Sequence, residues 1–232
     1  MLMQAIRSRI SVVIAALNEE QGIGPTLEEL RLVLSTSQVI VVDGNSVDRT
    51  VEIAKEMGAD VSLQEGTGKG DAMFQGVRQL PSSVRYVVFT DADFTYPAEF
   101  IPKMVEVLEH YPEVGMVIGD RFNGEQNFDK SITNPFYIGN RLIAVLQHVM
   151  NGIKLNDPLS GLRVVRAELL KDWKPKSKGF DVEAEINFLV ERNGYRIAEI
   201  PIDYRSRLGK KKLGMRHGFG IMRRIVAESF SM

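Results

Sequence analysis

The sequence predicts a doubly wound α/β sheet. Short runs rich in Val and Ile recur through the first half of the 232-residue chain, and segments with apolar residues at helical spacing separate them. Short apolar runs bounded by turn residues are typical of buried parallel strands, and their alternation with helices is typical of a doubly wound sheet. Such sheets bind ligands at the carboxyl ends of their strands.

The individual elements follow from this alternation. Strands are predicted at 10–16, 39–42, 59–63, 86–90 and 114–118. Helices are predicted between them at 25–34, 48–57, 69–80 and 97–110, several of them beginning at Pro or Asp. Beyond residue 120 we expect a polar loop at 121–134, a helix at 135–150, a polar turn at 157–163, a helix at 180–193 and a strand at 195–200. The chain then continues as a basic loop at 205–214 and an amphipathic helix at 213–230.

Composition excludes several kinds of chemistry. The chain has no cysteine, so disulfides, thiolate metal sites and cysteine nucleophiles are excluded, and its three histidines lie far apart in sequence. No apolar stretch reaches the eighteen or so residues of a membrane span, and the first residues lack a secretory h-region. We therefore expect a cytoplasmic protein whose metal, if any, is held by oxygen ligands.

The net charge of −1 hides an asymmetry along the chain. Residues 203–232 hold eight Lys or Arg and two acidic residues, whereas the first 202 residues are acidic. A basic end favours an anionic partner, and the apolar stripe of the last helix could lie on an anionic membrane surface or pack on the sheet.

The sharpest chemical signal is Asp91-Ala92-Asp93, directly after the predicted strand at 86–90. Residues two apart in a strand point the same way, so both carboxylates should reach one spot at the carboxyl edge of the sheet. Paired carboxylates repel each other unless a cation lies between them, and hard oxygen ligands suit Mg²⁺ or Mn²⁺. The alternative is a turn in which one Asp caps the next helix.

Three further polar clusters follow strands. Asp43 ends the second strand, where it could accept hydrogen bonds from a base or ribose, while Asp48 caps the next helix. Asn18 and Glu19 follow the first strand and form either a nucleobase contact or a solvated turn. The segment GTGKGD, which contains Lys69, resembles a phosphate-binding loop but lacks the Ser or Thr that a P-loop carries after its Lys.

Together these pieces resemble the family 2 glycosyltransferases of GT-A fold, and within them the dolichyl-phosphate mannose synthase-like group. The resemblance rests on motifs that occur in the family's order over nearly the whole chain. They are VVIAALNEE, VVDGNSVDRT, GTGKGDAMFQG, FTDADFTYP, IGDRF, DPLSGLRVVRAELL and GYRIAEIPIDYRSRLGKKKL.

The resemblance implies an inverting transfer of a hexose from GDP-mannose or UDP-glucose to a polyprenyl or dolichyl phosphate. It assigns the metal to Asp93 and Asp91 and divides the chain into a GT-A domain, 1–204, and a basic C-terminal segment, 205–232. Within the domain, 1–120 would bind the nucleotide sugar and metal, and 121–204 the acceptor. The expected nucleotide-binding residues are Ala16, Leu17, Asn18, Glu19, Asp43, Lys69 and Asp91.

A phosphate acceptor needs cations rather than a base, because its second pKa is about 6 and it is already ionised near neutral pH. The resemblance places six cations on the acceptor side: Arg121, Arg163, Arg205, Arg207, Lys211 and Lys212. The run 210–212 could equally be solvated surface. We expect Arg121, Arg163 and Arg205 to bind this phosphate, with Arg163 as the foremost candidate. Two family features are absent. Thr95 stands where mannose synthases often have a Gln metal ligand, and residues 132–137 lack the Arg and Ser that grip the lipid phosphate, which leaves Arg141 as a substitute.

Other functions remain open at this point. One is a glycosyltransferase for a soluble hydroxyl or a phosphorylated acid, with Asp157 or Glu183 as the base. Another is a non-catalytic module that binds sugar nucleotides. A sugar nucleotidyltransferase would instead place its glycine-rich loop directly after the first strand, where this chain has ALNEE.

Overall fold

The computed structural model describes residues 9–35, 37–125, 134–212, 214 and 216–230. In this part of the chain a seven-stranded sheet has the order β3-β2-β1-β4-β6-β5-β7. The strands are β1 (Ile10–Ala16), β2 (Gln38–Asp43), β3 (Asp60–Leu63), β4 (Tyr86–Asp91), β5 (Val114–Asp120), β6 (Arg163–Arg166) and β7 (Arg196–Pro201). The α-helices are α2 (Ile23–Val33), α3 (Thr50–Glu56), α4 (Lys69–Val77), α5 (Ile101–His110), α6 (Pro135–Asn151), α7 (Val182–Arg192) and α8 (Arg216–Ser229). The 3₁₀ segments are η1 (Ala98–Phe100) and η2 (Ala167–Leu170).

Six of these strands run in one direction, and β6 is antiparallel to both of its neighbours, β4 and β5. The predicted strands and helices are present, with bounds shifted by a few residues. The strand β6 is a correction, because the sequence predicts only a polar turn up to Arg163. Its insertion separates β5 from β4, so the sheet is mixed rather than wholly parallel.

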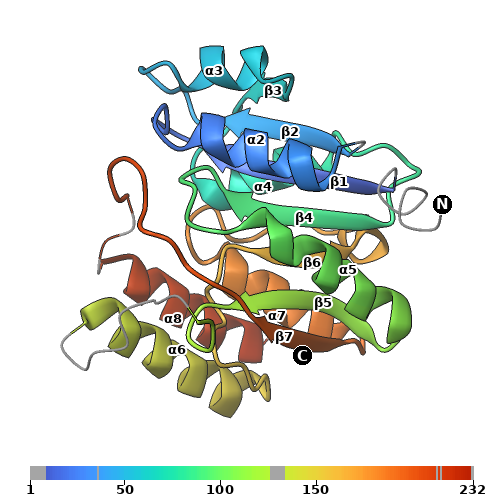
Figure 1. Cartoon of the computed structure of the whole chain (residues 1–232). Helices are drawn as coiled ribbons and strands as arrows, with labels where there is room; N and C mark the ends of the chain where they lie inside the picture. Colours follow the sequence, from blue (N-terminus) through green and yellow to red (C-terminus); the bar gives the residue numbers. More distant parts are fainter. Residues whose placement is uncertain (1–8, 36, 126–133, 213, 215, 231–232) are drawn as a thin grey trace.

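Helices cover both faces of the sheet, which confirms the doubly wound arrangement (Figure 1). On one face α2 and α5 contribute Leu27, Leu30, Met104 and Leu108 to the larger core cluster. On the other face Met73 of α4 and Ile186 of α7 pack with Trp173 in a second cluster. Burial of apolar surface on both faces is the main stabilising contribution in such a fold.

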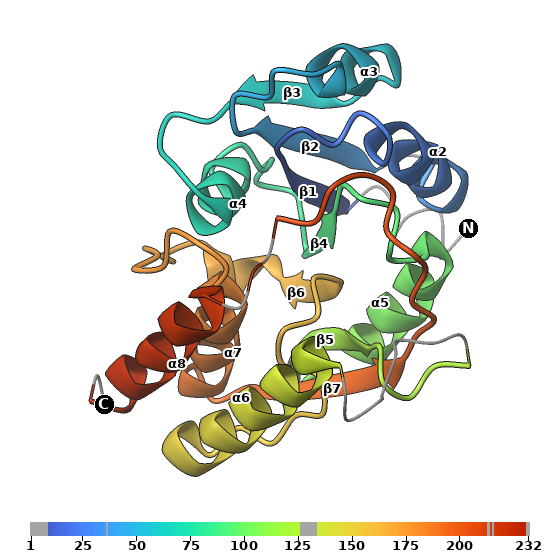
Figure 2. The same ribbon diagram turned by 90° about the vertical axis from the view of Figure 1, so that its left-hand side faces the viewer.

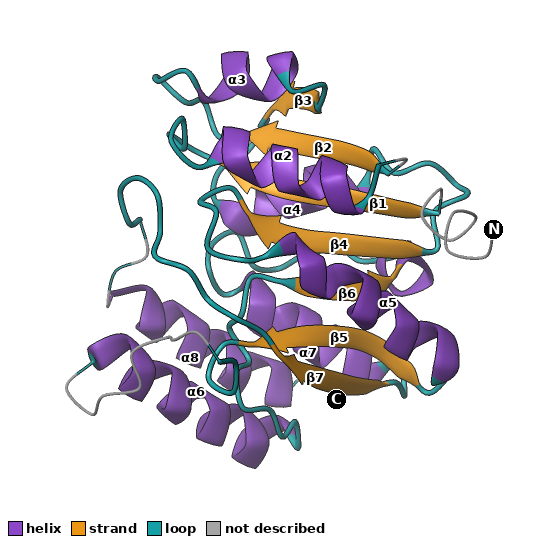
Figure 3. Ribbon diagram, in the orientation of Figure 1, coloured by secondary structure: helices purple, strands orange, loops and turns teal. Residues whose placement is uncertain are grey.

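The carboxyl ends of the parallel strands lie together at one edge of the sheet, on the left in Figure 3. The helices α6, α7 and α8 pack beside this edge, where Ile143, Ala184, Ile221 and Ile225 form a small core of their own. The chain between β7 and α8 crosses over the same edge (Figure 2). Segments from both halves of the sequence therefore meet where ligands are expected.

The C-terminal helix packs on protein rather than standing apart. Ile221 and Ile225 of its predicted apolar stripe are buried against α6 and α7, and Val226 is partly exposed. The predicted beginning of this helix at residue 213 lies outside the described residues, as do residues 1–8 and most of the predicted loop at 121–134. The boundary at 204/205 stays a prediction. Among the described residues, no helix has both the length and the apolar character to cross a membrane.

Candidate active site

A cavity of about 710 Å³ opens at the carboxyl edge of the sheet. Its walls come from the loops after β1 to β5, from the beginning of α6 and α7, and from the chain between β7 and α8. Ten charged residues line it: Lys69, Arg121, Arg205, Arg207, Lys211 and Lys212, with Glu19, Asp91, Asp93 and Glu183. The excess of cations suits an anionic ligand.

The DAD motif lies where the sequence places it. Asp91 ends β4, and its Oδ1 accepts a hydrogen bond from Lys69 Nζ at 2.7 Å. Asp93 Oδ1 accepts from Thr95 Oγ1 at 2.6 Å, and Asp93 Oδ2 accepts from Arg207 Nη1 at 2.8 Å. The turn directly after Asp93 holds Phe94 at φ +65°. This left-handed conformation costs a non-glycine residue free energy. The fold thus maintains a strained turn to present these acids.

The electrostatics show that the two acids interact. Burial raises the pKa of Asp93, and the nearby Asp91 carboxylate raises it further. Burial acts in the same direction on Asp91, but Lys69, together with Arg121 and Arg207, outweighs it and the net pKa of Asp91 is lowered. A divalent cation between the acids would remove this repulsion.

Glu19 completes an acid cluster with Asp91 and Asp93. Its Oε1 accepts hydrogen bonds from Arg207 and Lys212, while its Oε2 is buried and has no hydrogen-bond partner among the described residues. Burial raises the pKa of Glu19 despite both cations. The basic loop 205–212 therefore closes over the acid cluster, and backbone bonds from Arg205 N to Thr95 O and from Leu208 N to Asp93 O fix it there.

The donor atoms present fit a hard divalent cation. The carboxylates of Asp91 and Asp93 are the available oxygen ligands, and Arg207 Nη1 already occupies a cation position on Asp93. No three His, Asp or Glu side chains of the described residues converge as a complete metal site. Mg²⁺ and Mn²⁺ typically take their remaining ligands from substrate phosphates and water, so two carboxylates suffice. Thr95 orients Asp93 and is itself buried.

The nucleotide-binding candidates divide into two groups. Most of them line the cavity: Ala16, Leu17, Glu19, Lys69 and Asp91. Asn18 and Asp43 are not among the residues that line it, so their nucleotide contact stays a prediction. Asn18 Oδ1 accepts from Val47 N at 2.8 Å, and fully buried Asp43 accepts from Ser46 N at 2.8 Å. Both side chains shape the loop that presents Gly44 and Asn45 to the cavity.

The three expected arginines have three different environments. Arg121 lines the cavity, where Asp157 holds it through two hydrogen bonds of 2.6 and 2.7 Å, and its guanidinium lies over the Tyr204 ring. Arg205 also lines the cavity, but Glu29 binds its guanidinium at 2.6 and 3.0 Å. A carboxylate of the chain therefore holds each of these two arginines at the cavity wall.

Arg163 corrects the sequence-based expectation. Its side chain is 0% exposed and lies outside the cavity. Its guanidinium donates to the carbonyl oxygens of Pro158, Ser160 and Glu183 and to Asn187 Oδ1. An arginine whose donors are used by buried protein acceptors cannot reach a phosphate, so Arg163 supports the structure around the site. Arg141 is likewise outside the cavity and donates to Asn156 O at 3.3 Å.

A cation cluster, which we define as Arg121, Arg207 and Lys211, stands beside the acid cluster. The Lys211 ammonium lies 3.0 Å from the centre of the Phe136 ring, and no described carboxylate is within ion-pair distance of it. Burial lowers the pKa of Lys211, and repulsion by Arg121 and Arg207 lowers it further. All three residues are among the cations that the family resemblance places on the acceptor side, although Arg121 is more than 80 residues from the other two in sequence.

Asp157 and Glu183, the two acids considered as catalytic bases, both form ion pairs within the chain. Asp157 is fully buried and also accepts from Asn140 Nδ2 at 2.9 Å. Glu183 lines the cavity, and its Oε1 lies 2.6 Å from Lys69 Nζ. Phe180 and Tyr204, which the sequence does not single out, supply aromatic surface to the cavity.

A model of the family described as glycosyl transferase family 2 matches residues 11–173. The chain belongs to this family. Family 2 membership agrees with the observed site, in which a pair of acids at the end of β4 stands between a glycine-rich loop and a cationic wall.

Relatives and solved structures support the same assignment. The chain is 37% identical to a dolichyl-phosphate hexose transferase of Haloferax volcanii over 88% of its length and 86% of the relative's. It is 30% identical to an undecaprenyl-phosphate mannosyltransferase of Micrococcus luteus, over 88% and 87% respectively. Its fold is similar to glucosyl-3-phosphoglycerate synthase of Mycobacterium tuberculosis, solved with Mn²⁺, UDP and glucosyl-3-phosphoglycerate. That likeness has a TM-score of 0.73 at 25% identity and covers 99% of this chain and 82% of that one. The expected GT-A fold is confirmed, and the chain is a glycosyltransferase.

Proposed function

We propose that this glycosyltransferase transfers a hexose from a nucleotide diphosphate sugar to the phosphate of a polyprenyl or dolichyl carrier. The observation that carries the proposal is the cation cluster beside the acid cluster. Arg121 and Arg207 repel the Lys211 ammonium, and Lys211 has no carboxylate partner among the described residues. This arrangement favours an anionic ligand, which would relieve the repulsion. Relatives that are named for polyprenyl-phosphate acceptors support the same acceptor class.

The metal and diphosphate fit the acid side of the cavity. Asp91 and Asp93 would hold Mg²⁺ or Mn²⁺, and the metal would offset the negative charge of the departing nucleoside diphosphate. Lys69 stands beside Asp91, where its ammonium can bind a phosphate oxygen. Because Arg207 binds Asp93 in this structure, metal binding requires the guanidinium to turn from the acid toward a substrate phosphate.

The acceptor phosphate fits the opposite wall. Arg121 is held by Asp157, so its guanidinium is preorganised rather than ordered by the ligand. A phosphate dianion attacks the anomeric carbon without a base, which agrees with the engagement of Asp157 and Glu183 in ion pairs. In-line attack inverts the anomeric configuration.

A second candidate acceptor is a soluble phosphorylated acid. It is favoured by the structural likeness to a synthase that was solved with glucosyl-3-phosphoglycerate. The same cation cluster would bind the phosphate of such an acceptor. The surface around the cavity favours the lipid instead.

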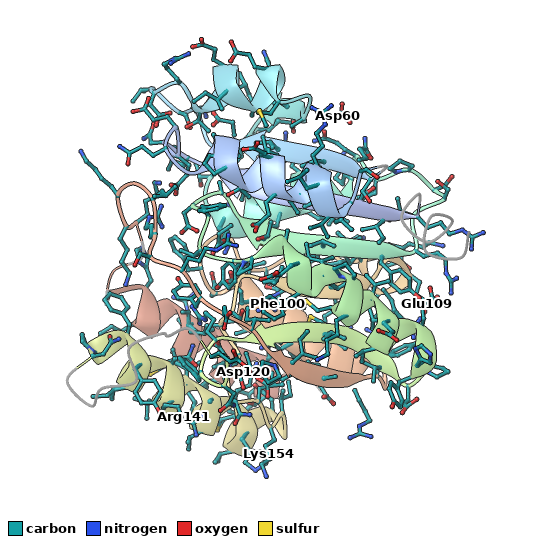
Figure 4. The ribbon with its side chains drawn as sticks, viewed as in Figure 1. Asp60, Phe100, Glu109, Asp120, Arg141 and Lys154 are labelled. Atoms are coloured by element: carbon teal, nitrogen blue, oxygen red, sulfur yellow. The ribbon has the colours of Figure 1, made fainter. Side chains whose placement is uncertain are left out.

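That surface is the outer face of α6. Its exposed apolar residues form one stripe: Ile138, Leu142, Val145 and Val149, with exposed fractions of 49, 57, 58 and 72%. The helix contains no acidic residue, and Arg141 and Lys154 lie at the same outer boundary of the molecule (Figure 4). Phe136, at the beginning of α6, lines the cavity. We therefore assign peripheral contact with an anionic membrane to α6, and not to α8, whose stripe is largely buried.

The experiment that tests the function is a transfer assay with two acceptors. Purified protein is incubated with Mn²⁺ and radiolabelled GDP-mannose or UDP-glucose, and either a polyprenyl phosphate in detergent or 3-phosphoglycerate. The proposal predicts sugar transfer to the polyprenyl phosphate, abolished by chelation of the metal. Transfer to 3-phosphoglycerate alone would establish the second candidate. Binding of donor and metal without transfer to either acceptor would contradict both.

A further inference from the structure

The carboxylate of Glu183 faces the cavity with one oxygen atom unused. Glu183 is the second residue of α7 and is only 4% exposed, yet it lines the cavity. Its Oε1 lies 2.6 Å from Lys69 Nζ, while its Oε2 is buried and has no hydrogen-bond partner among the described residues. A buried acceptor without a partner destabilises a fold, so such an atom at a cavity wall indicates a ligand that donates to it.

Through Lys69, Glu183 lies close to the proposed metal and diphosphate region. The same Nζ that contacts Glu183 also contacts Asp91 Oδ1 at 2.7 Å, so the two carboxylates flank one ammonium. Under the proposed function, Asp91 faces the diphosphate, and the first sugar carbon is bonded to that diphosphate. The hexose must therefore lie next to this region, within reach of Glu183.

Charge determines which ligand group suits Glu183. An ionised carboxylate accepts hydrogen bonds and repels phosphate, so neither substrate phosphate is a partner for Oε2. The cations that suit the phosphates lie elsewhere: Arg121, Arg207 and Lys211. A sugar hydroxyl is a neutral donor of suitable size, and a carboxylate is a strong acceptor for it.

The surroundings of Glu183 hold it in place. Buried Arg163 donates through Nη1 to the Glu183 carbonyl oxygen at 3.2 Å, and the same Nη1 donates to Asn187 Oδ1 of the next turn at 3.1 Å. Next to Lys69, Gly70 packs so closely that an added Cβ would lie 2.4 Å from Ser177 O and 3.2 Å from Val182 Cβ. The beginning of α4, which carries Lys69, and that of α7 are thus locked together. A preorganised acceptor of this kind gives selectivity, because a ligand that lacks the matching donor leaves it unpaired.

We propose that Glu183 recognises the transferred sugar: its Oε2 accepts a hydrogen bond from one hydroxyl of the donor hexose and so contributes to the choice of sugar. This inference rests on the proposed function. It makes Glu183 a specificity-determining residue and not a base.

The first test distinguishes recognition of the sugar from recognition of the nucleotide. Calorimetry with Mn²⁺ compares UDP with UDP-glucose, and GDP with GDP-mannose, for the wild type, Glu183→Gln and the control Asp181→Asn. The control removes a carboxylate from the same helix start but outside the cavity. For the sugar nucleotide that the wild type prefers, Glu183→Gln should lower affinity about ten- to hundredfold, with the affinity for the parent diphosphate changed less than about threefold. The control should match the wild type for both ligands.

The second test identifies the sugar hydroxyl that donates to Glu183. Its first step needs only the wild-type protein. Donors that lack one hydroxyl of the hexose at a time are compared, and one of them should bind wild type about ten- to hundredfold more weakly. For that donor the effect of Glu183→Gln should disappear, because its partner is already missing. Equal losses for diphosphate and sugar nucleotide, or an equal effect of the variant on every deoxy donor, would overturn the inference.

Two other outcomes are distinguishable from these. If Glu183→Gln binds every donor normally but loses turnover a thousandfold, the carboxylate acts on the acceptor as a base and the inference is wrong. If the wild type binds none of the four nucleotides, the proposed function itself is overturned together with the inference, and no variant is needed to show it.

Discussion

The two walls of the cavity differ in how their charges are satisfied. Each acid of the acid cluster has a cation partner within the chain: Lys69 for Asp91, Arg207 for Asp93, and Arg207 with Lys212 for Glu19. In the cation cluster, Lys211 contacts an aromatic ring and two like charges. A cation entering the acidic wall must displace a protein cation. On the other wall Arg121 pairs with Asp157 and Arg207 with Asp93, so an entering anion is expected to relieve repulsion mainly at Lys211, which has no carboxylate partner among the described residues. The same loop, 205–212, supplies cations to both walls, so binding on one side is expected to alter the other.

The largest effect is expected at the acidic wall. Asp93→Ala should lower metal-dependent turnover on the order of a thousandfold or more, because a carboxylate that holds the cation at the diphosphate is worth several kcal/mol of transition-state stabilisation. Turnover is measured in Mg²⁺ and Mn²⁺, with the exposed acid variant Asp172→Ala as control. Near-normal activity of Asp93→Ala would show that the metal is held elsewhere.

The next largest effect is expected on stability, and it shows whether Arg163 supports the fold or binds the acceptor phosphate. Arg163→Ala removes every hydrogen bond that its guanidinium makes and leaves buried carbonyl oxygens unpaired, so it should destabilise the fold by about 3 kcal/mol or more. Denaturant unfolding measures this loss, with Arg141→Ala as a control in which an exposed arginine is removed. If Arg163→Ala unfolds like wild type but loses acceptor use, the original assignment to the acceptor phosphate is restored.

A smaller effect is expected on the outer face of α6. Leu142→Ser combined with Val149→Ser should weaken binding to vesicles of anionic lipid about tenfold or more, since both side chains would leave an apolar phase. Leu32→Ser on α2, where the leucine is 77% exposed, is the matched control and should bind as wild type does. Point variants are preferable to removal of residues 214–232, because that truncation would also remove the buried contacts of Ile221 and Ile225. Equal vesicle binding by all three proteins would reject the membrane contact.

The smallest effect concerns Glu199, which accepts hydrogen bonds from the backbone amides of Asn156 and Asp157 and so supports the loop that holds Arg121. Burial raises the pKa of Glu199 above its ordinary 4.5, although these amides act to lower it. Folding therefore favours the protonated form. Its stabilising contribution is complete below about pH 4.5 and is lost as pH rises through the higher folded pKa.

Glu199→Gln stays neutral, so its thermal unfolding midpoint relative to wild type should increase between pH 4 and pH 7. The exposed variant Glu106→Gln serves as control for loss of one negative charge. A difference between Glu199→Gln and wild type that does not change with pH would contradict the raised pKa.

Local patterns predict much of the fold. The strands β1, β2, β4 and β5 and the helices between them follow from apolar periodicity, and the DAD pair follows from the alternation of side chains along β4. The sequence does not predict the strand β6, because its four residues follow a glycine-containing turn and its position between β4 and β5 depends on pairing with residues far away in sequence.

Side-chain direction limits the prediction of the site. Arg121 and Arg163 both follow polar motifs of the family pattern, but only their tertiary surroundings place one in the cavity and the other among buried carbonyl oxygens. For the apolar stripe of α8 the sequence leaves two alternatives, a membrane surface and packing on the sheet, and the structure shows it packed on α6 and α7. The exposed stripe of α6 becomes visible only once the buried face of that helix is known.

The central claim is that the cationic wall binds the acceptor phosphate, and steady-state kinetics tests it most directly. Polyprenyl phosphate is varied at saturating donor for wild type, Lys211→Ala and Arg121→Lys, with Lys55→Ala on α3 as an exposed control and donor affinity measured by calorimetry. Lys211→Ala breaks no ion pair among the described residues, and Arg121→Lys keeps a charge opposite buried Asp157 but loses the planar fork. We predict that kcat/KM for polyprenyl phosphate falls about ten- to hundredfold in both variants while donor affinity stays within about threefold of wild type. Loss of donor affinity with unchanged use of polyprenyl phosphate would contradict the account and assign these cations to the donor diphosphate.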